Sequence, residues 1–198
     1  MNRLATVAAI VGLLAAGAFI VGTAPDEDEV VEPFAITGEF GEPVVSPNYE
    51  ITITDVRLAT TITADYALTP LEARTSGTWV VVDAEVLPIA NGFTFSYAEL
   101  RIGEYSYRVS DLVPSSSLTS YLYQPGVPVR GSFAFEVPAS ALELARSAGA
   151  SVVFSERVAP ILESEPVIPL DLGGATIVAE IALDEAATLD PASTEGAE

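Results

Sequence analysis

The chain has 198 residues and a net charge of −20, with eight basic side chains, all arginine, against 28 acidic ones. Such a surface repels nucleic acid and anionic lipid headgroups, which sets nucleic-acid binding aside. Histidine and cysteine are both absent, which removes the commonest general base, the commonest transition-metal ligand, disulfides and thiolate chemistry. We therefore expect no metal, no cofactor and no enzymatic activity.

The first predicted element is a membrane-targeting helix. The run from Leu4 to Val21 is apolar and uncharged, follows Arg3 and ends shortly before an acidic stretch. A helix of this length reaches roughly 27 Å, enough for the hydrocarbon layer of a bilayer. The positive flank predicts a cytoplasmic N-terminus and an extracytoplasmic C-terminal domain.

Two fates of this segment stay open. Its length favours retention as an uncleaved signal anchor over residues 1–24, and Pro25 would make a poor backbone after a cut. Gly22 and Ala24 nevertheless satisfy the small-residue rule of a signal peptidase. We expect a single-pass protein of the cell membrane, with secretion after cleavage near Ala24 as the alternative.

The next segment, residues 25–43, is acidic and interrupted by proline and glycine, which predicts an extracytoplasmic stalk. Residues 44–183 then contain short β segments separated by turn residues, without alternating helices. This pattern predicts an all-β fold, an antiparallel immunoglobulin-like β-sandwich of about seven strands. The predicted strands cover 49–58, 79–86, 93–97, 105–109, 132–137, 152–154 and 175–183.

Local signals refine this prediction. A phase shift between Ile53 and Val56 predicts a bulge. Gly103 offers a hairpin turn, and residues 139–147, ended by Gly149, form one short helical candidate. Residues 184–198 lack any periodicity and predict a disordered acidic tail.

Two stretches, residues 77–86 and 123–138, together show a known pattern: a hydrophobic strand, then the Pro125-Gly126 turn and a strand that ends before Pro138. The pattern resembles the immunoprotective-antigen-like immunoglobulin domains of bacterial surface and secreted proteins, a group largely of unknown function. The resemblance covers roughly residues 44–168. It implies a seven-stranded sandwich outside the cell, on a lipoprotein or single-pass protein, and supplies no catalytic residues. The lipidation cysteine usual in such proteins is absent here.

An aromatic cluster supplies candidate binding residues. Exposed tyrosines offer large, stiff contact area for sugars or protein partners, and Tyr121 and Tyr123 are the least core-like of the set. We expect contacts from these two, with Tyr105 and Tyr107 as further candidates. The alternative packs these rings into the core and across neighbouring strands.

A second candidate is a carboxylate pair. Asp83 and Glu85 share one face of a predicted strand at about 6 to 7 Å, near the separation of glycosidase carboxylates. Used as acid and base, they would make a carboxylate-only glycan hydrolase of the cell envelope. The polar and apolar alternation of the strand instead predicts a solvent-facing row of charges.

The sequence thus predicts a membrane-anchored, extracytoplasmic binding or accessory module without catalysis, which engages an envelope protein complex or a transporter. The alternatives are the envelope glycan hydrolase and a secreted, antigen-like structural protein.

Overall fold

The computed structural model describes residues 3–23, 33–66, 69–90, 92–112, 118–157 and 163–189. The chain divides into two units, Met1–Glu32 and Pro33–Glu198. In the first unit, α1 runs over Arg3–Thr23. Among the described residues no helix has the length and apolar character that a membrane crossing needs, so the predicted transmembrane helix is not supported. The possible cleavage site near Ala24 lies outside the described residues.

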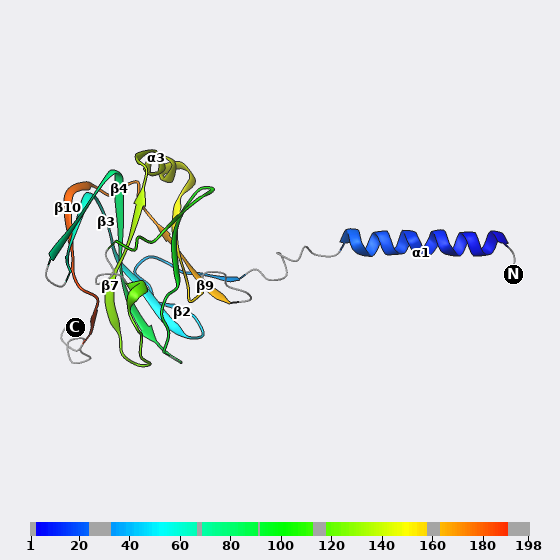
Figure 1. Cartoon of the computed structure of the whole chain (residues 1–198), viewed down its shortest axis with the longest axis horizontal. Coiled ribbons are helices and arrows are strands. Elements are labelled where there is room, and N and C mark those ends of the chain that lie inside the picture. Colours follow the sequence, from blue (N-terminus) through cyan, green and yellow to red (C-terminus); the bar gives the residue numbers. More distant parts are fainter. Residues whose placement is uncertain are drawn as a thin grey trace. The chain divides into compact units, whose positions relative to one another are not determined.

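The second unit is a β-sandwich, as predicted (Figure 1). Sheet A has the strand order β1-β9-β8-β5-β6, and sheet B has the order β10-β3-β4-β7-β11, with β2 paired to β3. The strands of sheet A are β1 (Phe34–Thr37), β5 (Tyr97–Ile102), β6 (Tyr105–Arg108), β8 (Ala150–Ser155) and β9 (Ser164–Leu170). The strands of sheet B are β2 (Val44–Val45), β3 (Tyr49–Tyr66), β4 (Thr69–Pro88), β7 (Val129–Val137), β10 (Ile177–Leu183) and β11 (Ala187–Thr188).

The pairing corrects three details of the prediction. The sandwich is not wholly antiparallel, because β1 pairs with β9 and β10 pairs with β3 in parallel. β1 lies inside the predicted stalk, and β11 lies inside the predicted disordered tail. Both are short edge strands fixed by backbone hydrogen bonds, among them Phe34 N to Glu163 O at 2.7 Å and Leu189 N to Pro128 O at 2.8 Å. Strands this short carry too few residues for a period of two to be visible.

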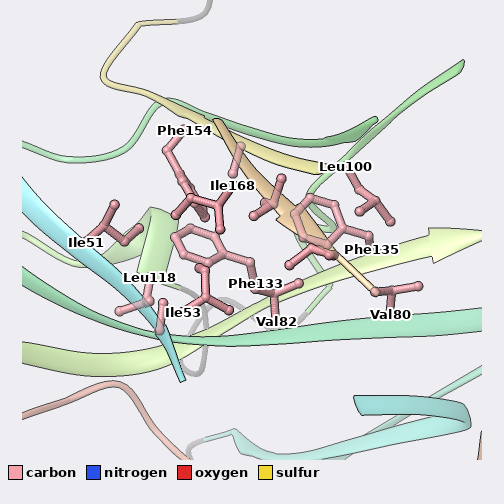
Figure 2. Packing of buried hydrophobic residues seen from close by; sticks show 14 of the residues in the cluster. Ile51, Ile53, Val80, Val82, Leu100, Leu118, Phe133, Phe135, Phe154 and Ile168 are labelled. Atoms are coloured by element: carbon pink, nitrogen blue, oxygen red, sulfur yellow. The ribbon is translucent and has the colours of Figure 1, made fainter. Parts of the chain in front are cut away.

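The main core lies between the two sheets, where the inward faces of their strands meet. Figure 2 shows side chains from both sheets pointing toward one another, with Phe133 packed among aliphatic and aromatic neighbours. The predicted inward row of β4, from Val80 to Val86 at alternate positions, is fully buried. Alternation therefore predicted the facing of these strands correctly.

The predicted bulge, turns and helix are present. The register of β3 and β4 shifts between Ile53 and Asp55, and Gly103 adopts a φ of 57° in the β5–β6 turn. α3 (Ala139–Ala148) directly follows Pro138 and ends at Gly149, whose φ is 78°. α3 lies at one end of the sandwich (Figure 1), and its buried side chains, Ala141, Leu142 and Ala145, belong to the main core.

A second, smaller core lies on the outer face of sheet B. Trp79 and Val81 alternate with the inward residues of β4 and are nevertheless buried, because the far end of the β3–β4 hairpin and β10 pack over them. Ala59 pairs with Trp79 while Thr61 pairs with Arg74, so β4 carries extra residues at this bend. The indole Nε1 of Trp79 donates to Ala73 O at 3.1 Å, which ties the hairpin end to its own strand.

Candidate functional site

Tyr123, predicted to be among the least core-like of the aromatic residues, is a core residue. Its side chain is fully buried and its hydroxyl donates to Leu118 O at 2.9 Å. Its ring stacks on Phe93, with the centroids 4.7 Å apart. Burial raises the pKa of the Tyr123 hydroxyl above its usual range, so it stays a neutral donor.

The other three tyrosines do not form one surface with Tyr123. Tyr121 is half-buried, with its ring centroid 5.4 Å from that of Tyr123. Tyr107 is half-buried and packs against the main core, whereas Tyr105 is 61% exposed. Tyr105 follows the Gly103 turn, which lies beside α3 at one end of the sandwich. Tyr121 and Tyr123 pack near the start of β3, at the opposite end. Tyr121 and Tyr105 thus stay separate candidates for contacts.

Asp83 and Glu85 lie side by side on the outer face of sheet B, each engaged by an arginine from a neighbouring strand. Asp83 accepts hydrogen bonds from Arg57 Nε at 2.7 Å and Arg57 Nη2 at 2.9 Å. Ser132 Oγ donates to the same carboxylate at 2.6 Å. Glu85 accepts from Arg130, whose Nε lies at 3.0 Å. This row is the predicted charged face of β4.

The register explains why Arg57 is needed. Asp55 of β3 stands directly opposite Asp83 of β4, and like charges opposite each other destabilise a sheet. Arg57, two residues further along β3, reaches back to Asp83 with a forked pair of hydrogen bonds. Such bidentate contacts are the stronger and more directional kind of ion pair. The arginine therefore neutralises one of the two facing carboxylates.

Asp83 and the side chains that bind it, Arg57 and Ser132, line a groove with a volume of about 640 Å³. The floor comes from β3, β4 and β7, and one wall comes from the chain that passes from β10 to β11, including Asp184 and Glu185. The groove residues are Thr54, Asp55, Arg57, Asp83, Arg130, Gly131, Ser132, Asp184, Glu185, Ala187 and Leu189. The sequence predicted a disordered tail over residues 184–198 and therefore no such wall. The wall lies over the sheet only because β11 pairs with β7.

Both carboxylates of the predicted acid and base pair are held in ion pairs. A hydrolytic acid and base must be free to give and take protons, whereas here both carboxylates of the predicted pair are engaged by guanidinium groups. Ser132 is buried, and its hydroxyl is held by Asp83, which Arg57 already engages. Within the described residues no group of three or more acidic side chains is arranged to hold a metal ion.

We expect Asp83→Asn to lower stability and leave the fold intact. The substitution removes the charge partner of Arg57, and because Arg57 is partly exposed the loss is about 1 kcal/mol in the free energy of unfolding. Urea denaturation measures it, with Glu143→Gln at an exposed position of α3 as the control, which should change little. Glycan turnover by the wild type that Asp83→Asn abolishes without a change in stability would restore the hydrolase alternative.

Sheet A carries a second charged network on its outer face. Glu99 and Glu165 have side chains that are each 6% exposed, and they share Arg101. Glu99 accepts from Arg101 and from the Tyr97 hydroxyl, whereas Glu165 lies 3.8 Å from Arg101 Nη2. Burial raises the pKa of Glu165; the Arg101 charge lowers it, and the charges of Glu99 and Glu163 raise it further.

This pKa shift predicts that Glu165→Gln stabilises the protein at neutral pH. When the pKa of a carboxyl is higher in the folded than in the unfolded state, its protonated form favours the folded protein. This contribution to stability is complete at a pH below the unfolded-state pKa, and it is lost as the pH rises through the folded-state pKa. The variant should therefore melt at a higher temperature than wild type at pH 7, and the difference should shrink as the pH approaches about 4.3. Glu143→Gln, at an exposed position of α3, is the control and should change little. A Glu165→Gln variant with a lower Tm at pH 7 would contradict this assignment.

No family model and no curated protein matches the chain. Several solved β-sandwich structures are similar to the chain in fold. An uncharacterized beta-sandwich protein from Clostridium difficile 630 is 14% identical, with 75% of this chain and 100% of that chain covered and a TM-score of 0.49. The yjhA protein from Bacillus subtilis is 13% identical, with 67% and 99% covered and a TM-score of 0.49. The secreted protein MPT63 from Mycobacterium tuberculosis is 17% identical, with 69% and 98% covered and a TM-score of 0.47. These likenesses assign no activity to the chain.

Proposed function

We propose that this chain is an exported binding module without catalysis, and that the groove on sheet B is its binding site. The groove itself carries the proposal, because its volume of about 640 Å³ falls within the range of sites that hold small ligands or short peptide segments. Its floor is held in place by hydrogen bonds between three neighbouring strands. A rigid floor lowers the entropy lost when a partner binds.

The proposal includes the location predicted from the sequence. The apolar run that ends at Val21 supports export, with the sandwich outside the cell. Retention at the cell membrane is the part of the proposal that the described helix does not support. The partner would then be an envelope protein or a transporter component. Fractionation of cells that express the full chain tests this: protein in the membrane fraction supports retention, and a mature form in the medium that starts near Pro25 supports the secreted alternative.

Site-specific crosslinking in native membranes tests the binding site. A photo-crosslinking side chain at Thr54, an exposed floor residue, should capture a partner. The same side chain at Ser140, an exposed residue of α3 at one end of the sandwich, is the matched control and should capture none. A third position, Tyr121, tests the aromatic candidate separately. Equal products from Thr54 and Ser140, or products from Tyr121 alone, would contradict the groove as the binding site.

A further inference from the structure

We propose that the groove holds a basic segment of a partner protein, recognised through arginine or lysine side chains. This inference rests on the proposed function and names the chemistry of its ligand. Three carboxylates of the groove have no basic partner in the described part of the chain, and they lie on both its floor and its wall. Their negative charge favours a cationic occupant over an anionic one.

The groove has an excess of negative charge once its ion pairs are counted. Arg57 is engaged by Asp83, and Arg130 is engaged by Glu85. Three further carboxylates of the groove, on Asp55, Asp184 and Glu185, have no basic partner among the described residues. Both arginines are thus already neutralised, and an incoming ligand meets the field of the uncompensated carboxylates.

These carboxylates stand on two sides of the groove. Asp55 belongs to β3 in the floor, whereas Asp184 and Glu185 belong to the wall between β10 and β11. A cationic side chain that enters between floor and wall can therefore meet carboxylates from both sides. Concave walls of low polarisability also focus the field of their charges and strengthen such contacts.

The charged part of the outer face of sheet B, which forms the groove, has no apolar layer of described residues over it. Where the face is apolar, around Trp79 and Val81, the hairpin end and β10 cover it. Where the face becomes charged, at Arg57 and Asp83, no apolar layer covers it in the described structure, and the groove begins. An apolar occupant would leave these charged groups without solvent or partners. A polar, cationic segment can replace the water that they lose.

Other occupants fit less well. A second copy of the chain carries the same net charge of −20, so two copies repel each other. An anionic ligand would have to approach the three uncompensated carboxylates. A lone metal ion is not favoured, since the described residues supply no cluster of three acidic ligands. A basic protein segment is complementary to the groove in charge and adds backbone hydrogen-bonding groups for Thr54 and the floor.

A peptide-binding measurement with the purified full chain in mild detergent tests the inference. The probes are a short peptide in which arginine and glycine alternate and a matched peptide with glutamate in place of arginine. The arginine peptide should bind, more weakly as salt rises, and the glutamate peptide should not. The double variant Asp184→Asn, Glu185→Gln should weaken binding by about tenfold, since each exposed ion pair is worth up to about fivefold.

The matched control is the double variant Glu104→Gln, Glu143→Gln, which removes the same charge at exposed positions away from the groove and should leave affinity within about twofold. Equal weakening by both double variants would show attraction to the acidic surface as a whole and would overturn the inference. Absence of arginine-peptide binding would also overturn it. In either case a crosslink from Thr54 but not Ser140 would leave the proposed binding function standing, so the two failures are distinguishable.

Discussion

Replacing Gly77 with alanine is expected to destabilise the sandwich by about 3 kcal/mol. A Cβ at this position would lie 2.1 Å from Val137 O and 3.1 Å from Pro138 Cα, both of them backbone atoms at the junction of β7 and α3. A flexible side chain could move away, but this junction is fixed by the pairing of Thr78 with Val137 and by the helix that follows. The substitution must therefore separate β4 from β7 where β4 bends.

Thermal unfolding measures this effect, and for a domain of this size a loss of about 3 kcal/mol lowers Tm by roughly 6 to 12 °C. Gly174→Ala is the matched control, because its added Cβ would meet nothing closer than an Asp171 side-chain oxygen at 3.4 Å. We expect that variant to melt within about a degree or two of wild type. Equal Tm values for the two variants would show that β4 and β7 can separate without loss.

Alternation of apolar and polar residues predicted the sandwich because long central strands carry a strong signal of period two. The buried row from Val80 to Val86 and the outward direction of Asp83, which is half-buried, both follow from that period. Turn chemistry was equally informative: Gly126 and Gly149 adopt the positive φ angles that their positions in a turn and at a helix end predict.

Edge strands and long-range contacts could not be predicted in this way. β1 and β11 owe their place to backbone hydrogen bonds with distant strands, which leave no periodic trace in a short segment. The second core around Trp79 could not be predicted, because alternation places Trp79 on the outer face of β4. Its burial depends on β10, which packs over that face and is distant in the sequence.

The candidate site shows the same division. The sequence predicted Asp83 and Glu85 as neighbours on one face, but their partners Arg57 and Arg130 come from strands far away in the chain. Tyr123 was misassigned because its place before a Pro-Gly turn is typical of a surface loop. In the structure its backbone N–H donates to Phe93 O at 3.0 Å, which draws this loop against the core. Site residues that depend on register stay hidden until strands are paired.

Phe95→Ala is expected to lower the free energy of unfolding by about 3 to 5 kcal/mol, because a large ring fully enclosed by others is removed. Phe95 is 1% exposed and lies at the centre of an aromatic cluster. Its ring contacts those of Tyr49 at 4.9 Å, Phe93 at 5.1 Å, Tyr123 at 5.4 Å, Phe133 at 5.8 Å and Phe154 at 5.9 Å between centroids. Edge-to-face pairs contribute beyond the area that they bury, so the loss should reach the upper part of this range.

Tyr105→Ala provides the comparison, because it removes a ring that is 61% exposed and should change stability by about 0.5 kcal/mol or less. Chemical denaturation of both variants decides between two roles of the aromatic residues in this domain. A large loss for Phe95→Ala alone means that the buried aromatic cluster holds the two sheets together. Similar losses for both variants would mean that the ring of Tyr105 supports the fold as much as the buried cluster does. Tyr105 would then be a structural residue and no longer a candidate for partner contacts.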